Sequence, residues 1–248
     1  MLKVFDNQYR VNYNDSDYTG RLSIAKLGNY ILDTAGLHAI ELGISMHQLA
    51  KRNLTWVISG MYFSFSSLPK VNSMVVVKTF VKDFSKIACK RDFIVTTENG
   101  EKIAEASSQW LVINTITRRP VFLDEVFPSF GEIVNLEEKK VEKNKHLRFS
   151  FSNPSAPFKY KVMYSDIDIN THLYSMRYLE LSLDVLGKDF FSEYRILSAD
   201  INFISEVLYN QDVEIYLEEP SNDIRQVEMI RDGSPVFRVE FKIEKITN

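Results

Sequence analysis

The chain has 248 residues, of which 45% are hydrophobic and 25% are charged, and these proportions are ordinary for a globular protein. Its net charge of −3, from 30 basic and 33 acidic side chains, argues against a broadly basic nucleic-acid-binding protein. The single cysteine, Cys89, excludes an intramolecular disulfide and a cysteine-based metal cluster. We find no signal peptide and no apolar stretch of membrane-spanning length, so we expect a cytoplasmic protein of one large domain or two smaller ones.

Two stretches of the chain resemble each other. The segments Tyr13–Asp33 and Tyr164–Asp184 align without gaps at a constant offset of 151 (164 − 13). The identical pairs are Tyr13/Tyr164, Asp15/Asp166, Asp17/Asp168, Leu22/Leu173, Leu32/Leu183 and Asp33/Asp184. In both halves a helical pattern is followed by several strand-like stretches and a turn that carries glycine. The sequence therefore predicts a duplicated fold.

The first half opens with a predicted helix. Ser23 precedes it as a candidate N-cap, and Gly36 is expected to end it. Its apolar face consists of Ile24, Leu27, Ile31 and Ala35. The β-branched and aromatic residues that follow predict strands over Met74–Val81, Ile87–Thr97 and Ile103–Asn114.

A charged segment without an apolar period separates the halves. We interpret residues 129–157 as a linker, because they contain the polar run Asn135–His146 between flanking prolines. The linker divides the chain into an N-terminal unit, 1–128, and a C-terminal unit, 158–248.

The second half repeats the order of the first. Ser175 is the candidate N-cap of its helix, and Gly187 is expected to end that helix. Apolar and charged residues alternate over Phe237–Glu244, which predicts a strand with one buried and one solvated face. Each half thus has one helix followed by an antiparallel sheet, an order that indicates the α+β class.

The halves differ just before the second helix. Asp168, Asn170 and His172 stand at alternate positions there, whereas the first half keeps only the aspartate. In an extended segment such positions project to the same side, next to the unpaired amides of the following helix. The arrangement suits attack on a carbonyl. A purely structural role in a turn or a cap is the alternative.

A second difference is a carboxylate in the last part of the chain. The predicted strand Asn202–Val207 aligns with Ser64–Pro69 at an offset of 138, so that Glu206 replaces Leu68. An outward-facing glutamate near a strand end would look the same. Two polar replacements confined to one half nevertheless favour a single active site in that half.

Three longer stretches resemble one family. Thr55–Val81 contains a Trp-Val pair, a proline and a valine-rich strand, and Gly100–Pro120 contains Gly-Glu, Ala-Ser-Ser-Gln-Trp and Thr-Arg-Arg. Ser165–Glu180 contains an Asp-x-Asn-x-His motif followed by Arg-Tyr. Over nearly its whole length the chain resembles the acyl-ACP thioesterases of plants and bacteria. This resemblance implies two tandem hotdog units, each a long helix wrapped by an antiparallel β-sheet.

The resemblance also implies a reaction and its residues. The expected activity is hydrolysis of the thioester of fatty acyl-[acyl carrier protein], which releases free fatty acid and terminates fatty acid synthesis. Asp168, Asn170, His172 and Glu206 occupy the positions of the family's catalytic residues, with Glu206 as either the general base or the nucleophile. The cysteine that family descriptions place after that glutamate is Val207 here. We therefore expect hydrolysis without a cysteine nucleophile. We also expect no cofactor and no metal.

In the family the first half shapes the pocket for the acyl chain. The residues that we expect to line it are Leu27, Ile31, Val57 and Met61. Ordinary core packing would account for each of them equally well. An aliphatic chain gains about 0.8 kcal/mol per buried CH₂ group, so the depth of such a pocket could select chain length.

The expected partner is an acyl carrier protein, which is acidic and should dock on basic residues. The candidates are Arg118 and Arg119, then Lys86, Lys90 and Arg91, then Lys139, Lys140, Lys143 and Lys145, although charged runs are usually solvated surface. No nucleic acid and no membrane span are expected, and a homodimer is left open. Two other functions stay open, an acyl-CoA thioesterase and a non-catalytic acyl-binding protein.

Overall fold

The structure is a computed structural model that describes residues 2–138, 141, 146–149, 151 and 154–246. The chain folds into two compact units, Met1–Lys143 and Asn144–Asn248. No described helix is long and apolar enough to cross a membrane.

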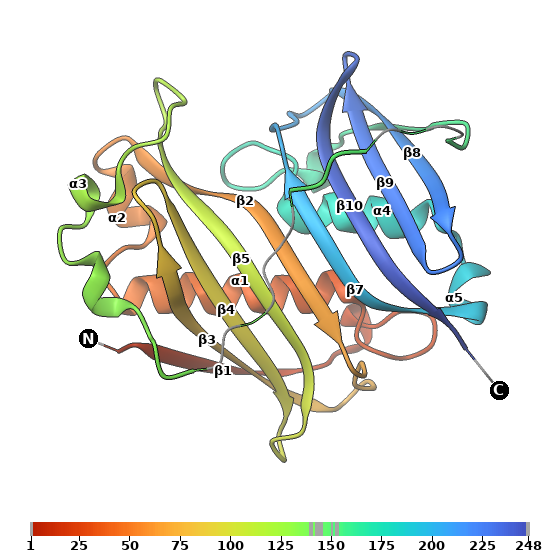
Figure 1. The fold of residues 1–248 in the computed structure, drawn as a ribbon, viewed down its shortest axis with the longest axis horizontal. Helices are drawn as coiled ribbons and strands as arrows, with labels where there is room; N and C mark the ends of the chain where they lie inside the picture. The colour runs from red at the N-terminus through yellow and green to blue at the C-terminus, as the bar shows by residue number, and fades with distance from the viewer. Residues whose placement is uncertain (1, 139–140, 142–145, 150, 152–153, 247–248) are drawn as a thin grey trace. The chain divides into compact units, whose positions relative to one another are not determined.

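The first unit is a five-stranded antiparallel sheet with one long helix, α1, against it (Figure 1). The strand order is β1-β3-β4-β5-β2. The elements are β1 (Val4–Arg10), the 3₁₀ turn η1 (Tyr13–Asp15), α1 (Ile24–Glu41), α2 (Met46–Ala50), β2 (Leu54–Phe65), β3 (Met74–Phe84), β4 (Ala88–Thr97), β5 (Lys102–Asn114), α3 (Leu123–Val126) and the 3₁₀ turn η2 (Phe130–Ile133). The three strands predicted for this half are confirmed with small shifts at their ends.

Helix α1 begins where its sequence predicts and ends later. The Ser23 side chain caps it by accepting a hydrogen bond from the Lys26 amide, as expected. The prediction that Gly36 ends the helix is wrong, because the helix continues to Glu41. Tertiary packing overrides the weak helix propensity of one glycine here. The chain instead leaves the helix at Gly43, whose φ of 75° is the left-handed conformation that glycine adopts most easily.

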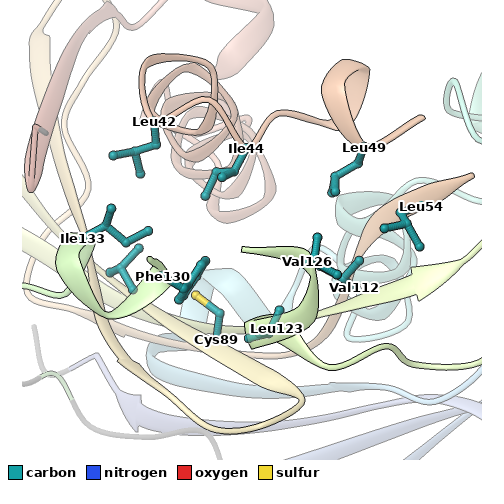
Figure 2. Close-up of a cluster of buried hydrophobic side chains, with 11 residues drawn as sticks. Leu42, Ile44, Leu49, Leu54, Cys89, Val112, Leu123, Val126, Phe130 and Ile133 are labelled. Atoms are coloured by element: carbon teal, nitrogen blue, oxygen red, sulfur yellow. The ribbon is translucent and has the colours of Figure 1, made fainter. Parts of the chain in front are cut away.

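A cluster of buried apolar side chains belongs to the first unit (Figure 2). Its members are Leu42, Ile44, Leu49, Leu54, Val81, Cys89, Val112, Leu123, Val126, Phe130 and Ile133. The indole of Trp56 packs against it and donates a hydrogen bond to the Ile44 carbonyl, 2.8 Å away. Phe130 and Ile133 fall within the stretch that we interpreted as linker, yet they are buried here.

The second unit has the same topology. Its strand order is β6-β8-β9-β10-β7, which corresponds one to one with the order in the first unit, and α4 lies against the sheet (Figure 1). The elements are β6 (Phe158–Lys161), the 3₁₀ turn η3 (Tyr164–Asp166), α4 (Ser175–Asp184), α5 (Phe190–Glu193), β7 (Tyr194–Phe203), β8 (Asp212–Ser221), β9 (Ile224–Arg231) and β10 (Ser234–Lys245). The α+β class and the two tandem hotdog units are confirmed.

Two local predictions for the second unit are wrong. Ser175 is the first residue of α4 and not its cap, since Tyr174 occupies the N-cap position without a capping side-chain hydrogen bond. Strand β7 ends at Phe203, so Glu206 follows the strand and does not lie within it. The chain leaves the ladder because the Ile204 and Ser205 amides both turn to one carbonyl, that of Val236.

Both offsets of the repeat are visible in the backbone. In the first unit the Leu22 amide donates to the Pro69 carbonyl at 2.8 Å, and in the second unit the Leu173 amide donates to the Val207 carbonyl at 2.8 Å. The donors differ by 151 residues (173 − 22) and the acceptors by 138 (207 − 69). Each unit therefore joins the turn before its helix to the loop after the next strand in the same way.

Candidate active site

The candidate site in the second unit begins with a tight turn. The Asp168 carboxylate accepts hydrogen bonds from the main-chain amides of Asn170 (2.8 Å) and His172 (3.2 Å). The Asp168 amide in turn donates to the His172 carbonyl at 2.9 Å, and Thr171 has a φ of 65°. The expectation of an extended segment is therefore wrong, because Asp168 folds these residues into a turn.

His172 and Glu206 meet across the turn and the loop that follows β7. The imidazole Nε2 lies 3.3 Å from a carboxylate oxygen of Glu206. The two side chains are 19% and 38% exposed, so solvent or a substrate can reach both. His172 is also paired with Leu208 in an isolated antiparallel bridge, which fixes its backbone against the Glu206 loop. An imidazole beside a carboxylate is an arrangement suited to general acid–base chemistry.

The Asn170 carboxamide lies at the same turn. Its nitrogen is 3.5 Å from the second carboxylate oxygen of Asp168, and its side chain is half-buried. The structure thus brings all four predicted residues of the second unit to one turn and one loop. Asp168 holds the turn through its hydrogen bonds, whereas Asn170, His172 and Glu206 are the candidates for contact with a substrate.

Three further side chains support the Glu206 loop. The Tyr178 hydroxyl accepts a hydrogen bond from the Val207 amide at 3.1 Å. The Arg231 guanidinium donates to the Glu206 main-chain carbonyl and to the Gln211 side-chain oxygen, the latter at 3.1 Å. That same Gln211 oxygen accepts a hydrogen bond from the Leu208 amide at 2.8 Å.

Burial raises the pKa of Tyr178 well above its ordinary value, and the negative charge of Glu206 adds to that effect. Tyr178 is therefore a neutral phenol at physiological pH. Sequence reasoning missed this tyrosine, although it is the Tyr of the Arg-Tyr pair after the motif. It missed Arg231 as well, because the only local signal there is the Asp232-Gly233 turn, which does not indicate a role for the arginine.

A polar network fixes the chain that leads into α4. Asp166 accepts hydrogen bonds from the Tyr160 hydroxyl (2.7 Å) and the Met163 amide (2.8 Å). Arg177 of α4 lies 3.1 Å from the same carboxylate. Asp166 is only 4% exposed, so these hydrogen bonds are shielded from water. They fix the segment that directly precedes the Asp168 turn.

The lone cysteine belongs to the first unit. Cys89 is buried in the apolar cluster of the first unit (Figure 2). Burial raises the pKa of its thiol to about 12, so the thiol stays protonated and is a poor nucleophile. Among the described residues, no group of three or more His, Cys, Asp or Glu side chains could hold a metal ion.

The predicted pocket residues all lie in the first unit. Leu27, Ile31 and Met61 are fully buried, and Val57 is half-buried. This burial is what core packing also produces, so their role in binding an acyl chain stays a prediction.

The predicted docking residues divide into three groups. Arg118 and Arg119 are exposed on the loop after β5 and remain candidates. Arg91 is 5% exposed and contacts His38 and Thr79, so the prediction that it helps to dock a partner is wrong. The four lysines of the third group, at positions 139, 140, 143 and 145, lie outside the described residues.

Family models match both units. The model described as the acyl-ACP thioesterase N-terminal domain matches residues 2–130, and the model of the C-terminal domain of the same family matches residues 152–242.

Two similar curated proteins come from plants. The palmitoyl-acyl carrier protein thioesterase of Gossypium hirsutum, a chloroplastic protein, is 26% identical over 71% of this chain and 45% of its own length. The chloroplastic dodecanoyl-[acyl-carrier-protein] hydrolase of Cinnamomum camphora is 24% identical over 74% of this chain and 51% of its own length. The chain therefore spans about half the length of the curated relatives it matches.

Solved structures match over both units. An acyl-ACP thioesterase from Bacteroides thetaiotaomicron superposes with a TM-score of 0.88 and 29% identity, covering 98% of each chain. The 12:0-ACP thioesterase from Umbellularia californica also gives a TM-score of 0.88, at 19% identity and with 99% of each chain covered. The second match, at this low identity, shows the fold alone.

Proposed function

Since the chain belongs to the acyl-ACP thioesterase family, we propose that it hydrolyses the thioester of a fatty acyl-[acyl carrier protein] and releases the free fatty acid. The observation that carries the proposal is the pairing of His172 with Glu206, 3.3 Å apart, beside the Asp168 turn. The names of the relatives, which act on acyl-carrier-protein substrates, support the same substrate class. Release of the fatty acid would end its elongation, so we assign the protein to fatty acid biosynthesis.

The reaction that fits these residues is attack of water on the thioester carbonyl. Glu206 and His172 activate the water and return its proton to the departing thiol, so that the C–S bond breaks as the new C–O bond forms. Direct attack by the Glu206 carboxylate is the alternative route, with water then hydrolysing the acyl-enzyme. In either route the sulfur leaves as a thiol and the acyl group as a carboxylic acid.

The other two residues have supporting roles. Asn170 orients or polarises the thioester carbonyl, because its carboxamide lies at the same turn as His172. Asp168 is a positioning residue, because both of its carboxylate hydrogen bonds to backbone amides hold the turn. Cys89 takes no part, since its thiol is buried and protonated.

The binding partners follow from the same chemistry. An acidic acyl carrier protein would dock through basic side chains, of which Arg118 and Arg119 are exposed candidates. Leu27, Ile31, Val57 and Met61 are the candidates for contact with the acyl chain. A cytoplasmic location and a homodimer stay predictions, and the plant relatives are chloroplastic proteins.

The test is a panel of acyl carrier proteins with acyl chains of different length, assayed for free fatty acid, with the matching acyl-CoAs alongside. We expect turnover of acyl-ACP by the wild type and its loss in E206Q. Equal or faster turnover of acyl-CoA would assign the protein to acyl-CoA hydrolysis instead. Binding of acyl-ACP without release of fatty acid would assign it to the non-catalytic acyl-binding proteins.

A further inference from the structure

One main-chain carbonyl is held by a guanidinium in both units. In the first unit the Arg21 guanidinium donates to the Leu68 carbonyl at 2.9 Å. Leu68 precedes Pro69, whose carbonyl accepts from the Leu22 amide. This carbonyl is therefore the counterpart of the Glu206 carbonyl in the second unit, which precedes the equivalent acceptor, Val207.

In the second unit the guanidinium comes from a different element. The residue equivalent to Arg21 is His172, whose imidazole faces the Glu206 side chain at 3.3 Å. The Glu206 carbonyl instead accepts a hydrogen bond from Arg231, at the end of β9. The carbonyl keeps a cationic donor, and the turn position becomes available for the imidazole.

The strand register of the first unit identifies the counterpart of Arg231. Phe65 of β2 pairs with Ala104 of β5, and Ala104 pairs with Val95 of β4. Two residues after Val95, the strand ends at Thr97, whose hydroxyl accepts a hydrogen bond from the Glu101 amide at 3.2 Å.

The same path through the second sheet leads to Arg231. Phe203 of β7 pairs with Phe237 of β10, which pairs with Met229 of β9. Two residues after Met229, the strand ends at Arg231. Arg231 thus stands where the first unit has Thr97, and a cation appears at this position only in the unit that carries the His–Glu pair.

We propose that Arg231 is a positioning residue for Glu206, whose backbone it anchors so that the carboxylate stays against His172. The expected effect on catalysis rests on the proposed thioesterase function. The anchoring of the Glu206 backbone by Arg231 rests on the geometry alone. The Arg231 side chain is 24% exposed, so the hydrogen bonds it makes are partly shielded from water and correspondingly stronger.

The first unit shows that the path of the loop does not depend on which element supplies the guanidinium, since Arg21 holds the Leu68 carbonyl there. Later in the loop each unit has an asparagine with positive φ, Asn72 at 71° and Asn210 at 65°. The main-chain amide of Asn72 donates to the Val11 carbonyl, and that of Asn210 donates to the equivalent Val162 carbonyl. The loop therefore keeps its path whether the guanidinium comes from the turn before the helix, as in the first unit, or from the strand end, as in the second. What Arg231 adds is control over the residue that carries the carboxylate.

The experiment compares R231M, which removes the donors, with R231K, which keeps the charge and one donor nitrogen. We expect R231M to lower kcat for acyl-ACP by about 10- to 100-fold with little change in KM, because displacement of a catalytic group by about 1 Å can cost about 10²-fold. R231K should recover part of the loss. A crystal structure of R231M should show a longer distance between His172 and Glu206 than in the wild type.

The control is R238M, which removes a guanidinium of similar burial, 17% exposed, that contacts Glu228 and the Leu147 carbonyl. We expect R238M to keep the wild-type kcat. Wild-type kcat in R231M, an unchanged distance between His172 and Glu206 in its crystal structure, or an equal loss of kcat in R238M would each overturn the proposal. Absence of acyl-ACP hydrolysis by the wild type would instead overturn the proposed function, and the crystallographic distance would still test the anchoring.

Discussion

The two units build the same turn and loop from different side chains. In the first unit the Asp17 carboxylate accepts hydrogen bonds from the Thr19 amide and hydroxyl, and Arg21 reaches across to the loop carbonyl. In the second unit Asp168 makes the corresponding turn, and a histidine faces a glutamate across the same gap. The aspartate belongs to the shared turn, whereas the His172–Glu206 pair is found at these positions in the second unit.

We infer from this difference that the proposed chemistry depends on the side chains and not on the duplicated backbone. The first unit keeps the turn and the loop of the second but has Leu68 where the second has Glu206. Matched substitutions in the two units can therefore separate what the fold needs from what the reaction needs.

The largest effect is expected at the equivalent positions His172 and Arg21. H172A removes the imidazole from its contact with Glu206 and should lower kcat by about 10²–10⁴-fold, the usual contribution of general acid–base catalysis. R21A removes only a hydrogen bond to a carbonyl and should leave kcat close to that of the wild type. The measurement is release of free fatty acid from acyl-ACP. If both variants lost activity equally, the chemical distinction between the units would be wrong.

A smaller effect is expected at the two aspartates that hold the turns. D168A should destabilise the turn and displace His172, with a loss of kcat of up to about 10²-fold. D17A should cost only stability, about 0.5–1.5 kcal/mol for each hydrogen bond lost. Urea unfolding and acyl-ACP kinetics on both variants check this. A D168A variant that is unstable but fully active would show that Asp168 serves the fold alone.

The buried histidine of the first unit, His38, should make stability depend on pH. His38 is fully buried and accepts a hydrogen bond at Nδ1 from Arg91, 2.8 Å away, while its Nε2 donates to the Leu2 carbonyl. Burial, together with the Arg91 charge, lowers the pKa of His38 from 6.5 to about 4. The folded state therefore resists a proton that the unfolded state accepts.

It follows that His38 contributes its full stability above about pH 6.5 and loses it as the pH falls from there to about 4. The loss should be on the order of 1–3 kcal/mol, since one pKa unit corresponds to about 1.4 kcal/mol. Urea unfolding across this pH range tests the prediction. H38Q should flatten the dependence, whereas H47Q, at an exposed position of α2, should not change it. A wild-type stability that is constant over this range would contradict the assignment.

The smallest effect is expected at the residue with positive φ in each turn. Thr171 has a φ of 65° and its counterpart Gly20 a φ of 73°. A non-glycine residue in this conformation costs about 1–2 kcal/mol, of which the entropy of an unfolded glycine offsets about 0.5–1 kcal/mol. T171G should therefore stabilise the protein by up to about 1 kcal/mol, and G20T should destabilise it by a similar amount.

Space does not complicate the Gly20 substitution, because an added Cβ would meet no atom within 4 Å. Thermal unfolding of the two variants gives the comparison directly. Opposite signs in the two units are the expected result. A destabilised T171G would mean that the threonine side chain makes a contact worth more than the backbone strain.

Much of the site could be predicted because the repeat preserves a local pattern. The shared residues from Tyr13 to Asp33 and from Tyr164 to Asp184 indicated the duplication, and the departures from it pointed to Asn170, His172 and Glu206. These signals are local or depend on a constant offset, so they need no knowledge of the tertiary structure.

Predictions of local geometry were less successful. The spacing of Asp168, Asn170 and His172 suggested an extended segment, but the side-chain hydrogen bonds of Asp168 fold it into a turn. A spacing of two residues does not distinguish these conformations. Gly36 likewise predicts the wrong end for α1, because tertiary packing carries the helix on to Glu41.

The sequence by itself determined the two-unit α+β organisation and the unit that carries the polar residues, since both follow from periodicity and from the differences between aligned positions. Only the tertiary structure decided that His172 meets Glu206 and that Arg231 holds the Glu206 carbonyl. These partners lie 34 (206 − 172) and 25 (231 − 206) residues apart in the chain. The register of β7, β10 and β9 brings Arg231 to the loop, and such a register results from the packing of a whole sheet and not from any local motif.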